Sequence, residues 1–282
     1  MMKLIDHFVC LSKMNKTIFL FGGGKLPNLI LKELIKTNYK FFVIEIGKTN
    51  IPKKYIDIKN LNLGKILTEL ILLKKLGYNK ILMAGSIKRP KLTEIKLDFN
   101  SIKLISKFTK EFLQGGDNRL LKFVIEQLEK IGFKVLQLNK LFPELFLGYG
   151  NQTKIKIKKN YFKDILKGSL ILKSTSKFDI GQSIIIQQGH VIGLEAAQGT
   201  DNLIKQSFTY LKETKEGILI KLFKVKQDLR ADLPTIGFKT LINCKKNGFV
   251  GIAYSANKTI FIDKEKIIKF CNSNKIFLYG IK

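Results

Sequence analysis

The sequence predicts an α/β protein with two domains, the first built on a mainly parallel sheet and the second on a mixed sheet. In the first half, short apolar runs alternate with segments whose apolar residues recur at helical spacing, which is typical of strand-helix-strand units. In the second half, hairpin-like pairs of apolar runs are mixed with helical segments. With 282 residues, 45% of them hydrophobic, the chain is long enough for two cores.

The N-terminal domain is expected over residues 14–150. Residues 17–21, TIFLF, form a continuous apolar run that ends in three glycines, as a buried parallel strand entering a tight turn would. The next expected elements are a helix at 26–38, a strand at 40–46, a helix at 63–79, a strand at 80–86, two helices separated by 115–118, and a strand at 134–138. Residues 151–160 are polar and Lys-rich and are expected to be the linker.

The C-terminal domain is expected over residues 161–282. Two strands around Gln188 and Gly189 predict a hairpin within 183–196. The next expected elements are a capped helix at 200–213, a strand at 217–224, a second hairpin at 249–263, a helix at 264–273 and a final strand at 275–281.

The charge balance favours anionic partners. The chain has 51 Lys and Arg against 22 Asp and Glu, a formal charge of +29, which suits anionic lipid headgroups, phosphorylated substrates or nucleic acid. The basic residues are spread evenly and do not interleave with aromatic ones, so charge alone does not indicate a nucleic-acid-binding protein. Drift of the composition toward Lys would explain the same charge. No stretch is long and apolar enough to span a bilayer, and neither a secretory signal nor a disulfide framework is indicated, so a cytosolic protein is expected.

The first candidate binding segment is the glycine loop after the first strand. Gly22, Gly23 and Gly24 stand between a strand and a helix, where backbone N–H groups can receive a phosphate, and Leu26 and Pro27 follow. The loop departs from G-x-G-x-x-G because Pro27 takes the place of the last glycine. An ordinary tight turn is the alternative.

Two further features are expected at the carboxyl edge of the same sheet. Glu45 ends the second strand, where a dinucleotide-binding fold often keeps a ribose-binding acid; a solvated strand end is the alternative. The segment AGSIKRP at 84–90 follows a strand directly, so its small and basic residues could contact a phosphate-bearing ligand, with a basic surface turn as the alternative. These residues are Gly85, Ser86, Lys88 and Arg89.

A third candidate segment is EAAQGTD at 195–201, which passes from a strand through a Gly turn to a helix. Glu195 would lie at the strand end beside two of the six alanines of the chain. Gly199, Thr200 and Asp201 follow, and either Thr200 or Asp201 could instead be a plain helix N-cap. The sequence has no paired His or Cys residues that could act together as metal ligands, so a bound metal would need oxygen ligands. Oxygen ligands indicate Mg²⁺ or Mn²⁺.

The strongest candidate is KQDLRADLPTIG at 226–237. In extended backbone, Asp228, Arg230 and Asp232 would point to one face. Arg230 is one of only three Arg among the 51 basic residues, and its planar fork suits phosphate. We expect one carboxylate to bind a metal or activate water while Arg230 holds a phosphate, as phosphoryl transfer requires. A surface salt-bridge ladder is the alternative.

These segments, in this order, resemble the family of UDP-2,3-diacylglucosamine pyrophosphatases of the LpxI type. The resemblance runs from about Met14 to Ile281 and is most specific in the last two of its marks. Its marks are GGGKLP, LGKI, AGSIKRP, GGDNRLL, DIGQS, EAAQGTD and QDLRADLPTIG.

The resemblance implies hydrolysis of the substrate's pyrophosphate by water with a divalent metal, giving UMP and 2,3-diacylglucosamine 1-phosphate (lipid X) in lipid A and hence lipopolysaccharide biosynthesis. It implies a Rossmann-like N-terminal domain that takes UDP and a C-terminal domain that takes the acylated sugar phosphate. The Asp before Leu-Pro-Thr-Ile-Gly is catalytic in that family, which is Asp232 here. Asp228 is the second expected metal ligand. The same segments add Gln182, Gln227 and Thr235 to the expected substrate contacts.

The chain departs from the family pattern at two positions. Family members often have Glu where Gln198 stands and a second acid where Asn118 stands, which bears on the metal site. The expected partners are the substrate and the anionic inner-membrane surface, on its cytoplasmic side; no nucleic acid is expected, and a homodimer is a further option. Two other functions stay open: a nucleotide-sugar or NAD-binding enzyme, and a non-enzymatic basic protein that binds nucleic acid or membrane.

Overall fold

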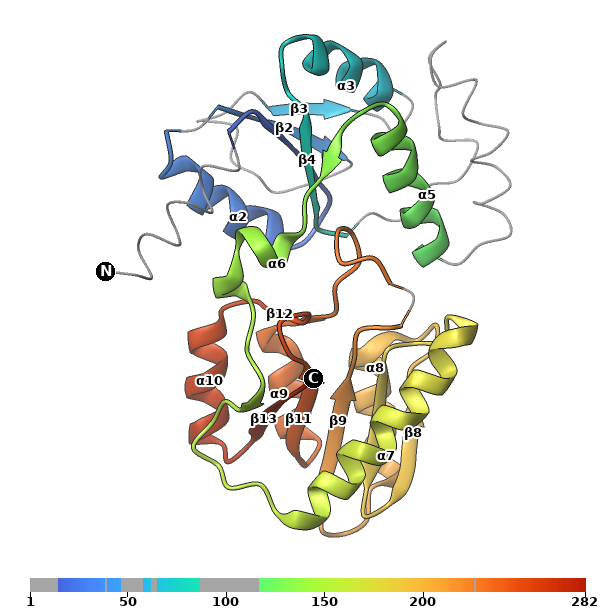
Figure 1. Cartoon of the computed structure of the whole chain (residues 1–282). Coiled ribbons are helices and arrows are strands. Elements are labelled where there is room, and N and C mark those ends of the chain that lie inside the picture. Colours follow the sequence, from blue (N-terminus) through green and yellow to red (C-terminus); the bar gives the residue numbers. More distant parts are fainter. Residues whose placement is uncertain (1–14, 39, 47–57, 62–64, 87–116, 226) are drawn as a thin grey trace. The chain divides into compact units, whose positions relative to one another are not determined.

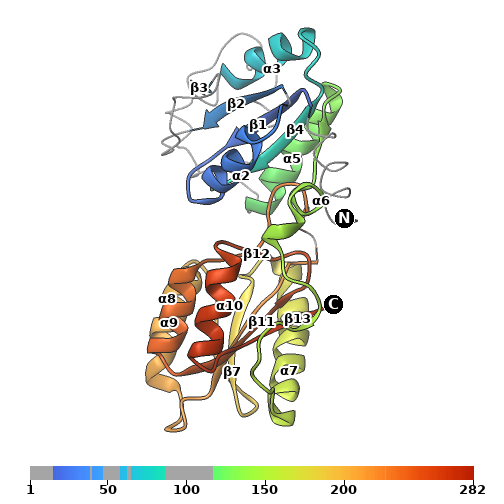
Figure 2. The ribbon, with the colours of Figure 1, turned by 90° about the vertical axis from the view of Figure 1, so that its left-hand side faces the viewer.

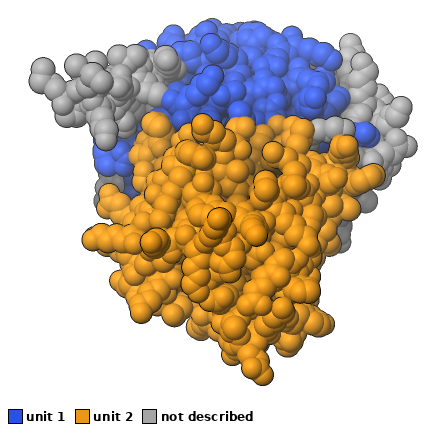
Figure 3. All heavy atoms as spheres, turned by 60° about the horizontal axis from the view of Figure 1, so that its bottom comes forward, with its two compact units in different colours: residues 1–142, 228–231 blue, residues 143–227, 232–282 orange. Residues whose placement is uncertain are grey.

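The structure is a computed structural model that describes residues 15–38, 40–46, 58–61, 65–86, 117–225 and 227–282 (Figure 1). The chain divides into two compact units, coloured separately in Figure 3. Unit 1 comprises residues 1–142 and 228–231, and unit 2 comprises 143–227 and 232–282. The chain therefore passes between the units three times, and two of these crossings bracket the short segment 228–231.

Unit 1 is built on a five-stranded sheet with the strand order β3-β2-β1-β4-β5, in which every neighbouring pair is parallel. This confirms the predicted parallel α/β architecture of the first half. Its elements are β1 (Thr17–Phe21), α2 (Leu26–Ile35), β2 (Phe41–Ile46), β3 (Ile58–Leu61), α3 (Ile66–Lys75), β4 (Lys80–Ala84), α5 (Asp117–Lys130), β5 (Lys134–Val135) and α6 (Leu138–Leu141).

Helices cover both faces of this sheet. Ile18 and Leu20 of β1 are buried in one cluster with Leu70 of α3 and Ile125 of α5. Because successive strand residues point to opposite faces, the fully buried Phe19 faces the other way. Figure 2 shows α2 on the side of the sheet away from α5. Burial on both faces explains why β1 reads as a continuous apolar run.

Unit 2 is built on a six-stranded mixed sheet with the order β6-β13-β11-β9-β7-β8. The three adjacent strands β13, β11 and β9 are parallel to one another. β6 pairs antiparallel with β13, β7 with β9, and β8 with β7. The predicted mixed sheet is confirmed. The elements are η4 (Pro143–Leu145), β6 (Gly150–Asn151), α7 (Lys159–Thr175), η5 (Ser176–Phe178), β7 (Ser183–Gln187), β8 (His190–Leu194), α8 (Gly199–Ser207), η6 (Phe208–Tyr210), β9 (Gly217–Lys221), β10 (Thr235–Ile236), α9 (Phe238–Lys246), β11 (Phe249–Ser255), β12 (Ile260–Phe261), α10 (Lys264–Ser273) and β13 (Phe277–Ile281).

The two faces of this sheet have different covers. Tyr161, Ile165 and Leu172 of α7 pack on one face, whereas α8, α9 and α10 pack on the other around residues such as Leu203 and Leu241. Figures 1 and 2 show α7 on the opposite side of the sheet from those three helices. Among the helices that the structure describes, none has both the length and the apolar character that a membrane span requires.

One local expectation differs from the structure. The hairpin around Gln188 and Gly189 is present, but the second hairpin, at 249–263, is not: β12 pairs in parallel with β10 instead of with β11. Ile260 donates its N–H to the carbonyl of Pro234 at 2.8 Å, and this bond holds β12 beside β10. Residues 151–160, predicted as the linker, belong to unit 2.

Candidate active site

The glycine loop of unit 1 lies beside the end of β4. Gly23 donates its N–H to the carbonyl of Ser86 at 2.7 Å and accepts from the N–H of Ser86 at 2.9 Å, and Gly22 donates to the carbonyl of Ala84 at 2.9 Å. β1 and β4 are neighbours at the point where the strand order reverses, which is where open α/β sheets bind ligands. The structure therefore brings two of the predicted segments together.

The same contacts limit which groups could receive a phosphate. The N–H groups of Gly22 and Gly23 are already donated to carbonyl oxygens, so a phosphate would bind farther along, at Gly24 and the first turn of α2. Leu26 and Pro27, which begin α2, are buried, so they shape the loop rather than presenting their side chains to a ligand.

Other predicted residues of unit 1 have different outcomes. Gly85 has a φ of +92°, and a Cβ atom there would lie 2.7 Å from the carbonyl oxygen of Gly23, so the close approach of the two loops requires glycine. Glu45 is buried in β2, which is not the environment of a solvated strand end. Lys88 and Arg89 lie outside the described residues.

Asp228 and Arg230 form a turn that belongs to unit 1. The carboxylate of Asp228 accepts from the Arg230 backbone N–H at 2.9 Å, from its Nε at 2.8 Å and from its Nη2 at 2.6 Å. The Nη1 of Arg230 is paired with Glu129 of α5, and Ala231 packs on the unit 1 core. Hydrogen bonds from Arg230 lower the pKa of Asp228, and the same pair raises the pKa of Arg230.

The expectation that three charged side chains share one strand face is therefore wrong. Residues 229–231 form a turn closed by the N–H of Ala231 and the carbonyl of Asp228 at 3.2 Å. An Asp side chain that accepts from the amide two residues on competes with extended backbone, which explains the turn. For Asp228 and Arg230 the salt-bridge alternative describes the arrangement, whereas Asp232 returns to unit 2.

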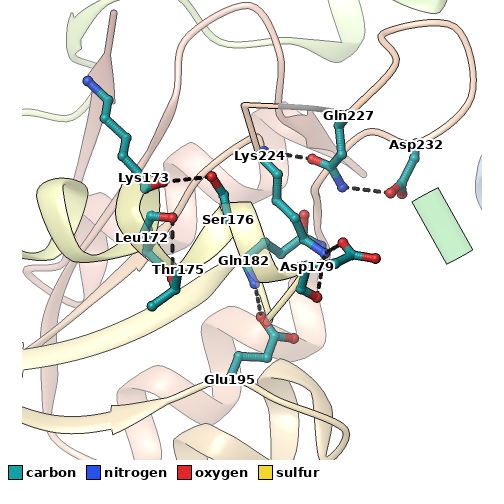
Figure 4. Close-up of polar contacts among 10 residues, drawn as sticks. All are labelled: Leu172, Lys173, Thr175, Ser176, Asp179, Gln182, Glu195, Lys224, Gln227 and Asp232. Carbon is teal, nitrogen blue, oxygen red and sulfur yellow. Dashed lines mark hydrogen bonds and ion pairs between the residues drawn. The ribbon is translucent and has the colours of Figure 1, made fainter. Parts of the chain in front are cut away.

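Asp232 is held by a relay of hydrogen bonds within unit 2. Its Oδ2 accepts from Nε2 of Gln227 at 2.6 Å, and Oε1 of Gln227 accepts from the N–H of Lys224 at 2.8 Å (Figure 4). The second bond fixes which end of the Gln227 amide faces the carboxylate. Lys224 in turn pairs its Nζ with Asp179 at 2.7 Å. The predicted contacts Gln227 and Asp232 are thus brought together.

A buried charged cluster lies at the ends of β8 and β9. Thr200 donates its hydroxyl to Oε1 of Glu195 at 2.8 Å and accepts from Nζ of Lys221 at 2.7 Å. The N–H of Gln182 approaches the other oxygen of Glu195 at 3.3 Å, as Figure 4 shows. Glu195 and Lys221 are each 7% exposed. Two predicted residues, Glu195 and Thr200, therefore meet directly, and Thr200 also contacts the buried Lys221, which sequence reasoning missed.

The signal for Lys221 was available but weak. It ends the run GILIK, in which all five residues are buried, and a charged side chain in a buried strand needs a partner. Burial lowers the pKa of Lys221, and the charges of Glu195, Asp201 and Asp232 oppose that shift. Asp232 and two acids of the EAAQGTD segment therefore lie within electrostatic reach of one ammonium group.

The start of α8 differs from the N-cap expectation. The helix begins at Gly199, after Gln198, and has no side-chain cap. Thr200 uses its hydroxyl in the buried cluster, and Asp201 accepts from Thr240 at 3.3 Å. Gln198 braces its own loop through the N–H of Ala196 at 2.9 Å and the carbonyl of Leu194 at 3.1 Å. The remaining predicted contact, Thr235, donates to the carbonyl of Leu233 at 3.3 Å.

Unit 2 also contains a cavity of about 290 Å³ beside this cluster. Its lining combines apolar residues with lysines from α7, the loop after β9, the loop after β11 and the C-terminus: Lys173, Lys224, Lys258 and Lys282. Gln182 lies on its wall, and within the part of the chain that the structure describes its buried Oε1 has no hydrogen-bond partner. A ligand that offers a donor could satisfy that oxygen.

The described residues contain no group of three or more His, Cys, Asp or Glu side chains arranged to hold a metal ion. The two acids expected as ligands, Asp228 and Asp232, belong to different units. Both oxygens of Asp228 are engaged by Arg230. Of this pair, Asp232 is the better candidate ligand.

Comparisons with known proteins agree with this pattern of segments. The model of the LpxI N-terminal domain matches residues 16–145, and the model of the LpxI C-terminal domain matches residues 148–279. The chain belongs to the LpxI family. A relative from Caulobacter vibrioides, the UDP-2,3-diacylglucosamine pyrophosphatase LpxI, is 26% identical over 278 residues, which cover 95% of this chain and 98% of the relative. The LpxI match does not favour the NAD-binding alternative, and the predicted recognition of the family is confirmed.

Proposed function

We propose that this chain hydrolyses the pyrophosphate of UDP-2,3-diacylglucosamine to UMP and 2,3-diacylglucosamine 1-phosphate in lipid A biosynthesis. The observation that carries the proposal is the LpxI match over both units, with a relative of that activity aligned to 95% of the chain. In this reaction water attacks one phosphorus, one P–O bond of the anhydride breaks, and the other phosphate leaves.

Each unit would take one part of the substrate. Unit 1 would bind UDP, which the glycine loop at the switch point of its parallel sheet and the buried Glu45 support. Unit 2 would bind the acylated sugar phosphate, which the cavity with its four lysines supports. These lysines would contact the phosphate as point charges.

Asp232 would accept the proton of the attacking water or position that water. Support comes from Gln227, which holds the carboxylate at 2.6 Å, and from Lys221, whose positive charge lies near it. Asp228 would position Arg230. Because one edge of the Arg230 guanidinium holds Asp228, Arg230 would meet a phosphate with the edge that now pairs with Glu129.

A divalent ion, Mg²⁺ or Mn²⁺, is part of the proposal. Mg²⁺ is commonly bound by one or two carboxylates together with substrate phosphates and water, so a single ligand such as Asp232 fits. When bound, such an ion would neutralise charge on the pyrophosphate. Asp228 fits this role less well because Arg230 occupies its oxygens.

The expected place of action is the cytoplasmic face of the inner membrane. The acyl chains would anchor the substrate in that membrane. A formal charge of +29 would keep the protein near its anionic headgroups.

The test is release of UMP from detergent-dispersed UDP-2,3-diacylglucosamine, with Mg²⁺ and with a chelator. We expect wild-type turnover, and a fall in kcat on the order of 10²- to 10⁴-fold in Asp232→Asn. Asp263→Asn is the matched control, because Asp263 is exposed and has a φ of +64°, a conformation that Asn also tolerates. A folded Asp232→Asn variant with normal turnover would show that Asp232 is not catalytic. If the wild type released no UMP, the proposed substrate would be wrong.

A further inference from the structure

The outer face of α7 exposes apolar side chains in a row. Phe162, Leu166 and Leu170 are four residues apart, so they lie one above the other on the helix surface. Their exposed fractions are 41%, 62% and 59%. The core does not need them, because α7 packs on the sheet through its other side, with Tyr161, Ile165 and Leu172.

A second row, of lysines, runs beside the first. Lys159, Lys163 and Lys167 are also four residues apart, and all three are exposed, as is Lys173 in the last turn. The acid of this helix, Asp164, is buried and accepts from the N–H of Gly189 at 2.7 Å. The exposed charges of α7 are therefore all positive.

Aromatic side chains continue the apolar row beyond the helix. The ring of Phe162 meets that of Tyr279 edge-on at 5.2 Å, and Tyr279 lies 6.2 Å from Tyr149. Tyr149 is 56% exposed, and Nζ of Lys282 lies 4.9 Å from the centre of its ring. An aromatic ring with a polar tip beside a Lys suits the boundary between headgroups and acyl chains.

We propose that this surface, the α7 face, docks on an anionic lipid bilayer with the helix lying in the plane of the interface. Its residues are Tyr149, Lys159, Phe162, Lys163, Leu166, Lys167 and Leu170. Apolar side chains flanked by lysines, with no exposed acid on the helix, complement anionic headgroups above an apolar layer. Protein–protein interfaces are depleted in Lys, so a row of exposed lysines beside the apolar row fits a lipid surface better than a protein partner. The choice of a lipid surface rests in part on the proposed function, whose substrate is acylated.

The experiment is flotation of the full chain with vesicles of phosphatidylethanolamine and phosphatidylglycerol, and with vesicles of phosphatidylcholine alone. We expect binding to the anionic vesicles and little to the neutral ones. Leu166→Gln with Leu170→Gln should weaken binding on the order of 10-fold or more, because insertion of two apolar side chains is lost. Replacing Lys159, Lys163 and Lys167 by Gln should weaken it on the order of 100-fold.

The controls remove the same charge, and one comparable leucine, elsewhere in the chain. The triple change Lys245→Gln, Lys246→Gln and Lys269→Gln lies on α9 and α10, on the opposite face of the sheet. Leu72→Gln alters an exposed leucine of α3 that is 50% exposed. Both controls should bind as the wild type does.

Three outcomes of the flotation experiment would overturn the inference: a wild type that does not float with anionic vesicles, α7 variants that bind normally, or control variants that lose as much binding. A wild-type dimer that the leucine changes convert to a monomer would also overturn it, by making the α7 face an interface between two copies. UMP release from detergent-dispersed substrate should persist in every folded variant. Failure of the docking inference is therefore distinguishable from failure of the proposed reaction.

Discussion

The hydroxyl of Thr200 links two buried charges, so Thr200→Val should destabilise unit 2 strongly. The hydroxyl accepts from Lys221 at 2.7 Å and donates to Glu195 at 2.8 Å. A hydrogen bond to a charged group contributes about 1.5 to 3 kcal/mol, so the two together contribute about 3 to 6 kcal/mol. Because Val keeps the shape and the two charges can move toward each other, we expect a loss near the lower end, about 3 kcal/mol.

Urea unfolding of the full chain measures this loss. With eight Tyr and no Trp, tyrosine fluorescence and circular dichroism are the signals, and a shift of the midpoint at unchanged m gives the free-energy difference. Hydrogen exchange at β9 and α8 shows whether the loss is in unit 2. Thr240→Val is the matched control, because its hydroxyl makes a longer bond, 3.3 Å, to the partly exposed Asp201.

The control should lose less than about 1 kcal/mol, since a long bond to a partly solvated carboxylate contributes little. If Thr200→Val loses no more than Thr240→Val, the hydroxyl does not stabilise the buried charges. The argument that the cluster depends on this bridge would then be wrong.

Three further predictions concern other parts of the chain. Gly85→Ala should lower the free energy of unfolding, measured by thermal unfolding, by about 2 to 4 kcal/mol, because a Cβ atom would lie 2.7 Å from the glycine loop at a φ of +92°. Gly24→Ala, with a φ of +98° and no atom within 4 Å, should lower it by about 1 to 2 kcal/mol. Equal losses would contradict the close approach of the two loops. Burial raises the pKa of Cys271 to about 12 from 9.0. The thiol therefore contributes stability below pH 9, and the free energy of unfolding should decline by about 1.4 kcal/mol per pH unit as the pH rises toward 12. Cys271→Ala should lessen this decline in urea midpoints, and an unchanged decline would contradict the assignment. Arg230→Lys removes the fork that lowers the pKa of Asp228, so that pKa should rise in an NMR titration; no change would show that the pair is not formed in solution.

Local pattern was sufficient for much of the fold. The run 17–21 followed by three glycines is a buried strand and a turn, and the Gln188–Gly189 pair closes a hairpin with φ values of +48° and +78°. These features depend on neighbours in the sequence, which is why they could be predicted. The prediction of a hairpin that includes 260–261 was wrong because the strand partner of this run, 235–236, is distant along the chain and pairs in parallel.

The segment 226–237 shows the limit for the candidate site. Its unusual Arg and acids marked it correctly as worth attention, but alternation alone predicted one shared face. The Asp228 side chain closes on Arg230 instead, and the chain then changes units before Asp232. Alternation describes side-chain direction only where the backbone stays extended, and a local hydrogen bond decided otherwise.

By itself the sequence determined the α/β class, the order of most strands and helices, and the resemblance to the LpxI family, because periodicity and short motifs are local properties. Only the tertiary structure decided that Glu195, Thr200 and Lys221 share one buried cluster, that Gly22 and Gly23 have already donated their amides, and that α7 leaves an apolar row uncovered. These depend on which strand ends meet and which faces are covered. Contacts between residues distant in sequence set desolvation and charge pairing, and those set which groups can bind or react.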